Sequence, residues 1–155
     1  MRRLDPTLTL AGAAVIALVF VAVRHRPEGV TAARIEEALA PTFGNLVNLQ
    51  RSRLGLPEIG SGVLQAAAQC QKAGATARAS RGAGEWTCTL RWSSPGQRLA
   101  LRDTYDLSVT PDGCFAATAD GSEAHLGGPT IKARDGTSLT NLLYRFEGCF
   151  DTTGR

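Results

Sequence analysis

Histidine and lysine are scarce in this sequence of 155 residues, which contains two of each. It also lacks a Gly-x-Ser-x-Gly elbow, a His-Glu-x-x-His pair, a Walker phosphate loop and a Cys-x-x-Cys pair. These absences remove the common signatures of serine hydrolases, zinc proteases, nucleotide-binding enzymes and zinc-binding cysteine clusters. The sequence therefore predicts no catalytic residue, no cofactor and no metal site.

Clustered positive charge is also missing from most of the chain, although the formal net charge is +3. From residue 27 onward, 13 basic residues face 13 acidic ones, so this part is neutral. Proteins that bind nucleic acid through phosphates need clustered Lys and Arg. We therefore predict no nucleic-acid partner. The excess charge lies in residues 1–26, which carry Arg2, Arg3, Arg24 and Arg26 against Asp5.

The longest apolar run lies at the N-terminus. Residues 6–23 are uncharged, and as a helix they would span about 27 Å, close to the thickness of a bilayer core. This predicts a single transmembrane anchor, with a cytoplasmic stub and anchor in residues 1–26 and a linker in residues 27–30. A cleaved signal peptide and a buried soluble helix are the alternatives. Signal cleavage requires small residues at the first and third positions before the cut, and Phe20 precedes Ala22.

Four cysteines, an even number, all follow the apolar run: Cys70, Cys88, Cys114 and Cys149. Disulfides persist outside the cytosol, so we expect the N-terminus in the cytoplasm and residues 31–155 in an extracytoplasmic, disulfide-linked domain at the cell membrane. Three pairings are possible. In a meander, a strand would separate Cys88 from Cys114, which favours Cys70 with Cys88 and Cys114 with Cys149.

The pattern of residues 31–155 predicts an α+β fold, with short helices packed on an antiparallel meander of four to five strands. Thr31 is a suitable N-cap, and Ile35 and Leu39 form an apolar pair. Pro41 is expected to end this first helix and begin a second one, which Gly55 would terminate. Residues 63–70 fit a helix or a strand equally well.

Strands are predicted from period-two alternation in residues 86–92, 99–110 and 114–119, with further pieces at 130–134 and 139–150. Turn sequences separate them, such as Pro111-Asp112-Gly113. Asp103 is the single charged residue on an apolar side. A bulge that rotates Asp103 outward and an inner face that ends early are the two explanations. Residues 72–84, rich in small residues, predict a loop.

Beyond the apolar run, chemistry could come only from a few side chains. His125 follows Glu123 by two residues, a spacing that could hold a metal or orient a base, although a polar loop is the simpler interpretation. Trp86 and Trp92 share one strand face. They could stack on sugar rings, but core packing is the more common use of such a pair.

Four cysteine-bearing or strand motifs resemble those of uncharacterised exported or membrane-anchored actinobacterial domains. The motifs are Trp86-Thr-Cys88-Thr-Leu, Tyr105-Asp-Leu-Ser-Val109, Asp112-Gly113-Cys114-Phe and Leu143-Tyr-Arg-Phe146-Glu-Gly148-Cys149. The resemblance covers about residues 60 to 151 and implies a strand topology with paired cysteines. It implies no activity and no catalytic residue.

The sequence thus predicts a single-pass membrane protein with an extracytoplasmic domain, attached to the membrane through residues 6–23. The expected function is a non-enzymatic binding or accessory module of the cell envelope, with an envelope protein or ligand as partner. The alternative is an envelope hydrolase or thiol-redox enzyme that uses His125 or a labile disulfide.

Overall fold

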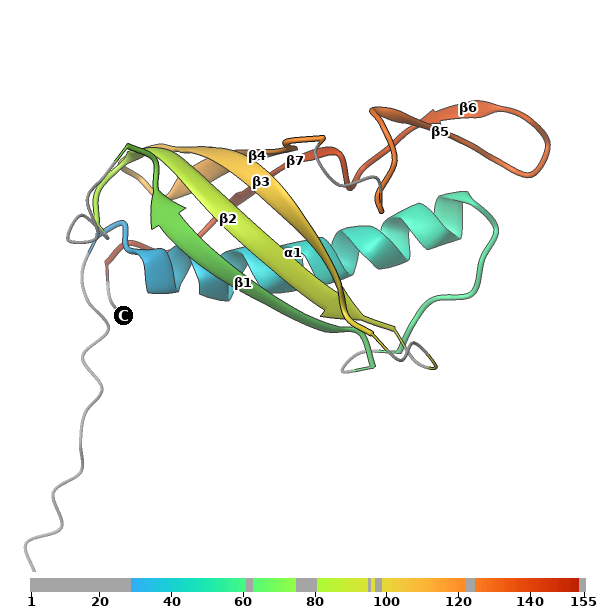
Figure 1. Ribbon diagram of the computed structural model, residues 1–155, viewed down its shortest axis with the longest axis horizontal. Helices are drawn as coiled ribbons and strands as arrows, with labels where there is room; N and C mark the ends of the chain where they lie inside the picture. Colours follow the sequence, from blue (N-terminus) through green and yellow to red (C-terminus); the bar gives the residue numbers. More distant parts are fainter. Residues whose placement is uncertain are drawn as a thin grey trace, which may run out of the picture.

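One helix lies against one face of a five-stranded antiparallel sheet in the computed structural model of the chain (Figure 1). The structure describes residues 29–60, 63–74, 81–94, 96, 99–121 and 125–153. The sheet has the strand order β1-β2-β3-β4-β7, and β5 pairs with β6 in a separate hairpin. The elements are α1 (Ala32–Arg53), β1 (Gln65–Lys72), β2 (Gly84–Ser93), β3 (Leu101–Val109), β4 (Cys114–Ala119), β5 (Thr130–Lys132), β6 (Ser138–Thr140) and β7 (Arg145–Cys149).

The helix α1 replaces the two short helices predicted from the sequence. Thr31 caps its N-terminus by accepting from the Arg34 N–H at 3.3 Å, and Gly55 follows its end with a φ of +66°, as expected. The expected break at Pro41 is wrong, because Pro41 lies inside the helix.

An apolar stripe explains why the helix continues through the proline. The side chains of Ile35, Leu39 and Phe43 are all fully buried. Each such burial contributes about 1.5–3 kcal/mol, whereas an interior proline costs about 3 kcal/mol. The stripe crosses the Pro41 position, so ending the helix there would expose Phe43. Burial therefore outweighs the lost backbone hydrogen bond.

The predicted fold class is also wrong in its transmembrane helix. In the described part of the chain, α1 is the sole helix, and no helix there has both the length and the apolar character that crossing a bilayer requires. The apolar run at residues 6–23, the stub and the first half of the predicted linker, residues 27–28, lie outside the described residues. Of the linker, Gly29 donates its N–H to the Thr152 carbonyl at 2.8 Å, and Val30 is buried.

The core lies between α1 and the face of the sheet that carries the alternating apolar residues. On β2 these are Trp86, Cys88, Leu90 and Trp92, and the register places them opposite Leu107, Tyr105, Asp103 and Leu101 of β3. This face continues onto β4 and β7 through Phe115, Ala117 and Phe146. The period-two alternation thus located the inner face correctly.

Asp103 departs from both explanations given for it. The pairing of β2 with β3 is regular through Asp103, without a bulge, and the inner face extends to Leu101. The Asp103 side chain is only 2% exposed, on the inner face beside Tyr105. Leu99, which the alternation placed on the apolar side, lies outside β3 and is 80% exposed.

The segment that was ambiguous, residues 63–70, contains most of strand β1. Its alanines alternate in burial, because Ala66 and Ala68 face the helix and their neighbours face solvent. Strand pairing with β2 over eight residues decides the conformation against the helix propensity of alanine. Of the predicted loop at residues 72–84, positions 75–80 lie outside the described residues.

The β5–β6 hairpin projects beyond the end of the sheet (Figure 1). Buried Asn141 holds its base, because the side-chain amide donates to the carbonyls of Leu126 at 2.7 Å and Gly128 at 2.8 Å. The amide oxygen of Asn141 accepts from the Leu143 N–H at 3.1 Å. One side chain therefore connects the segment before the hairpin to the turn that leads into β7.

Candidate functional site

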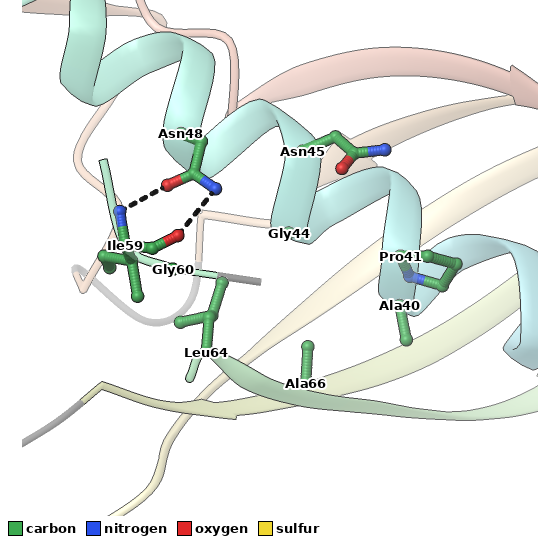
Figure 2. A pocket seen from close by; sticks show the side chains of 9 residues that line it. All are labelled: Ala40, Pro41, Gly44, Asn45, Asn48, Ile59, Gly60, Leu64 and Ala66. Carbon is green, nitrogen blue, oxygen red and sulfur yellow. Dashed lines mark hydrogen bonds between the residues drawn. The ribbon is translucent and has the colours of Figure 1, made fainter. Parts of the chain in front are cut away.

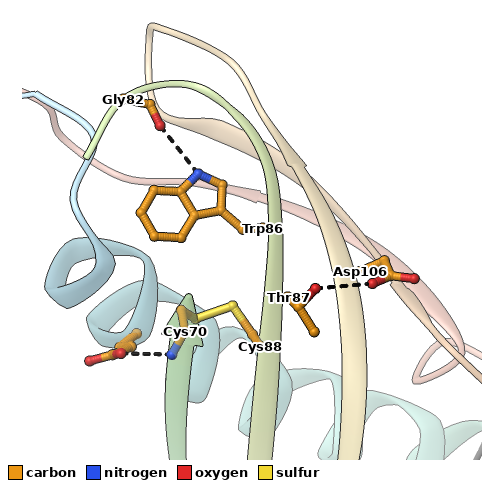
Figure 3. The surroundings of a disulfide bond; sticks show 7 residues. Cys70, Gly82, Trp86, Thr87, Cys88 and Asp106 are labelled. Carbon is orange, nitrogen blue, oxygen red and sulfur yellow. Dashed lines mark hydrogen bonds between the residues drawn. A yellow bond between two sulfur atoms is a disulfide. The ribbon is translucent and has the colours of Figure 1, made fainter. Parts of the chain in front are cut away.

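The four cysteines form the two disulfides expected from the sequence, Cys70–Cys88 and Cys114–Cys149. Each joins residues directly opposite each other on neighbouring strands, β1 with β2 and β4 with β7. Since β1 and β7 are the outermost strands, both sheet edges are covalently attached to their neighbours. Figure 3 shows the first bridge between its two strands.

The two tryptophans serve the core, as the simpler interpretation predicted. Trp86 is 1% exposed and donates its Nε1–H to the Gly82 carbonyl at 3.2 Å (Figure 3). Trp92 packs against Phe43 with ring centroids 5.0 Å apart. Neither ring is open to a sugar.

His125, the candidate for the enzymatic alternative, is exposed in a turn. Glu123, its proposed partner, lies outside the described residues. His125 lines neither of the two hollows discussed below. Within the described residues, no group of three metal-ligating side chains is present. The geometry therefore offers no observation in favour of His125 as a base or ligand.

A cleft of about 340 Å³ lies between α1 and the open edge of the sheet at β1 (Figure 2). Its lining comes from the middle of α1, from the segment after the helix and from the start of β1. The nine lining residues are Ala40, Pro41, Gly44, Asn45, Asn48, Ile59, Gly60, Leu64 and Ala66. None of them carries an ionisable side chain, so the cleft is unsuited to acid–base catalysis or metal binding.

One wall of the cleft is held by Asn48. Its amide donates to the Ile59 carbonyl at 3.1 Å and its amide oxygen accepts from the Ile59 N–H at 2.8 Å. This pair of bonds fixes the segment after α1 against the helix, as Figure 2 shows. Asn45 is exposed and points away from this segment (Figure 2). Asn45 is therefore available to a ligand, whereas Asn48 is used by the fold.

Two residues that disfavour helices lie on the cleft side of α1. Pro41 cannot donate to the Glu37 carbonyl, and Gly44 is about 1 kcal/mol less favourable than alanine within a helix. A Cβ added at Gly44 would meet only Leu64 Cδ2, at an ordinary 3.8 Å. Packing therefore does not require a glycine here. Violations of local preference without a packing reason are typical of functional surfaces.

The backbone of β1 presents hydrogen-bonding groups beside the cleft. The Ala73 N–H donates to Glu85, so the odd-numbered residues of β1 bond to β2 and the even-numbered ones point to the open edge. The Cys70 N–H agrees with this, because it donates outward to Glu36 Oε1 at 2.7 Å. Ala66, which lines the cleft, directs its N–H and C=O the same way.

A second hollow, of about 550 Å³, lies where the β5–β6 hairpin meets β7. Its lining includes Tyr144 and Phe146 as well as the charged pair Arg145 and Glu147. Phe146 packs edge-on against Tyr105, with ring centroids 5.4 Å apart. The Tyr105 hydroxyl donates to the Leu143 carbonyl at 2.7 Å. Burial, and then the charge of Asp103, raise the pKa of Tyr105 well above its usual range.

Sequence reasoning missed the first hollow because its lining contains no ionisable residue. It missed the second because the hairpin base and the charged residues of β7 come together only in the fold. The signals available were Pro41 and Gly44, three residues apart in α1, and two charges of opposite sign in the last strand. No family model, curated protein or solved structure matches this chain. The two disulfide-bonded pairs are consistent with an extracytoplasmic domain.

Proposed function

We propose that this domain is a non-catalytic binding module of the cell envelope, and that the α1–β1 cleft takes an uncharged, extended segment of a partner protein. The observation that carries the proposal is the combination of a cleft without ionisable side chains and a strand edge with outward-pointing backbone groups. A ligand for such a site must bring backbone donors and acceptors together with small apolar side chains. An extended peptide has both.

Strand addition is the recognition mode that fits these features. In that mode the main-chain hydrogen bonds of an edge strand supply affinity, and pockets for alternate side chains supply specificity. Gly44 on α1 has no side chain and Ala66 on β1 has only a methyl group, so a peptide backbone has room to approach β1. The volume of about 340 Å³ falls at the small end of the range for ligand sites, which suits one or two peptide side chains.

The location is tested by labelling thiols on intact cells with a reagent that does not cross membranes. Disulfides persist in oxidising compartments, so we expect labelling only after prior reduction. Labelling that requires lysis but no reductant would place the domain in the cytoplasm and contradict this part of the proposal. This measurement does not depend on the ligand.

The binding site is tested with a photoreactive amino acid at position 45, which is exposed and lines the cleft. Gln69 provides the matched control, because it is an exposed amide on the outer face of β1. In irradiated cells we expect a crosslink from position 45 to a discrete peptide segment, identified by mass spectrometry, and none from position 69. Equal crosslinking from both positions would rule out the cleft as the site.

A pair of variants at Gly44 separates binding from stability. Gly44→Ala fits without a clash and should raise the free energy of unfolding by about 1 kcal/mol. Gly44→Leu also favours the helix but places a branched side chain in the cleft. We expect Gly44→Leu to lower crosslinking from position 45 at least about tenfold, and Gly44→Ala to retain most of it. Similar crosslinking in both variants contradicts the proposed site.

A further inference from the structure

The outer side of β7 has backbone groups that nothing in the sheet uses. The strand is last in the order β1-β2-β3-β4-β7, and among the described residues no strand pairs with its other side. The Ala119 N–H donates to the Tyr144 carbonyl, and the Phe150 N–H donates to the Gly113 carbonyl. In an antiparallel pair this alternation directs the N–H and C=O of Arg145, Glu147 and Cys149 away from β4.

We propose that two copies of this chain associate through their β7 edges. The two strands would run antiparallel about a two-fold axis beside Phe146, and the two five-stranded sheets would become one sheet of ten strands. A two-fold contact of this kind is self-complementary, because each residue pair occurs twice. This inference does not depend on the proposed ligand of the α1–β1 cleft.

Backbone polarity limits the registers that such a pair can adopt. Only residues whose N–H and C=O point outward can form hydrogen-bonded pairs across the interface, so odd-numbered residues must lie opposite odd-numbered residues. Three two-fold registers place Arg145 or Glu147 opposite one of these same two residues of the second copy. One places Arg145 opposite the second copy's Arg145, one places Glu147 opposite Glu147, and the third places Arg145 opposite Glu147.

Among these three registers, the side-chain charges favour the one that places Arg145 opposite Glu147 of the second copy. Arg145 and Glu147 are both exposed and lie on the outer face of the sheet, since Phe146 between them is buried on the inner face. Opposite charges that face each other across two strands are favourable, and like charges are unfavourable. Charged side chains normally protect an edge strand from pairing. In this register the charges do not prevent pairing, because each Arg145 lies opposite a Glu147 of the other copy.

The second hollow lies beside this edge. Tyr144 and Phe146 line it on the inner side of the sheet, and Pro129 lines it from the hairpin base. A second strand along β7 would cover this volume of about 550 Å³ with side chains from the other copy. The Cys114–Cys149 bridge holds β7 to β4, so the edge is already ordered before a second copy binds.

The opposite edge lacks these features. Its outward backbone groups are partly used, since Glu36 accepts from the Cys70 N–H, and α1 lies along it. No pair of opposite charges lies in adjacent outer-face positions of β1, whose outer residues are Gln65, Ala67, Gln69 and Gln71. Association through β7 therefore leaves both α1–β1 cleft edges open, one at each end of the joined sheet.

The test is charge exchange in the full-length chain, examined by sedimentation over a range of concentrations. Arg145→Glu gives an edge with two negative charges, and Glu147→Arg gives one with two positive charges. Both positions are exposed, so neither substitution disturbs the core. We expect each single variant to raise the dimer dissociation constant at least about tenfold relative to the unmodified chain.

Mixing the two single variants provides the decisive measurement. In the inferred register the negative edge lies opposite the positive edge, so an equimolar mixture should recover the association of the unmodified chain to within about threefold. Contacts through residues 6–23 would be equal in all samples and cannot produce this recovery. The proposal is overturned if the unmodified chain stays monomeric at every concentration, if the single variants associate as it does, or if the mixture shows no recovery.

Discussion

The two edges of the sheet are alike in their disulfides but differ in the burial of those disulfides and in the charge of their side chains. Each edge strand is joined to its neighbour by a disulfide between directly opposed residues. At the β1 edge, the Cys70–Cys88 bridge faces α1, and Cys88 is fully buried. At the β7 edge, the Cys114–Cys149 bridge lies on the outer face, and Cys149 is exposed.

The polar groups of the two edges differ as well. The β1 edge borders an uncharged cleft beside the helix, whereas the β7 edge carries Arg145 and Glu147 next to a hollow at the hairpin base. An uncharged edge binds an added strand through main-chain hydrogen bonds and through the fit of its side chains. A charged edge accepts only a strand whose charges are arranged to match. On the two proposals made above, one small domain binds a peptide at the β1 edge and a second copy of itself at the β7 edge, at opposite ends of one sheet.

Removing the two disulfides one at a time is expected to change the free energy of unfolding more than any other change at the two edges. On the chain-entropy model, Cys114→Ser with Cys149→Ser should lower the free energy of unfolding by about 4 kcal/mol, for a separation of 35 residues. Cys70→Ala with Cys88→Ala should lower it by about 3 kcal/mol, for a separation of 18 residues. Urea denaturation of both variants measures the two losses.

The same disulfides should also differ in accessibility to reductant. Exchange requires a thiolate to reach a sulfur, so mild reductant should open Cys114–Cys149 before the buried Cys70–Cys88. Timed alkylation followed by mass mapping gives the order. Simultaneous opening of both bridges would show that the two edges are not distinct in this respect.

A smaller effect is expected from Asn141, which supports the β7 edge alone. Asn141→Ala leaves two carbonyls and the Leu143 N–H without their partner in a buried site, and should lower the free energy of unfolding by about 2–3 kcal/mol. Asn45→Ala removes an exposed amide at the β1 cleft and should change it by less than about 0.5 kcal/mol. Equal losses in the two variants would contradict the role assigned to Asn141.

The last prediction concerns the loss of stability at alkaline pH that follows from ionisation of Tyr105. Its folded-state pKa is raised, so its contribution to stability is fully present below the unfolded-state pKa of about 10 and is lost as the pH rises above it. The loss should be about 1.4 kcal/mol for each pH unit above 10. Tyr105→Phe should be less stable at neutral pH, because the bond to Leu143 is missing, but should lose less stability between pH 10 and pH 11. Parallel alkaline profiles would argue against this assignment.

Much of the sheet could be predicted because strand signals are local. The alternation in residues 86–92 corresponds to β2, and residues 114–119 match β4. The cysteine pairing followed from the order of these strands. Pro41 and Asp103 were misjudged because each obeys a local rule that a tertiary contact overrides. Pro41 lies within a helix held by buried neighbours, and Asp103 lies buried where the pairing of β2 with β3 requires an inward side chain.

The candidate sites were beyond sequence reasoning for a different reason. The α1–β1 cleft combines residues from the helix, from the segment after it and from β1, and contains no residue type that signals chemistry. The charges of β7 are visible in the sequence, but their meaning depends on β7 being an outer strand. That position follows from the pairing of β4 with β7 across the inserted β5–β6 hairpin.

The sequence by itself determined β2, β3 and β4 and both ends of the helix, and it favoured the observed pairing of the four cysteines, because hydrophobic period, caps and turns act over a few residues. Strand β1 was decided only by its pairing with β2. Tertiary structure alone decided that the helix passes Pro41, that Asp103 is buried, and which backbone groups remain open at each edge. These properties depend on strand register and on contacts between distant segments. A one-residue change of register would reverse which side of β7 carries the charges, and the local pattern would still look the same.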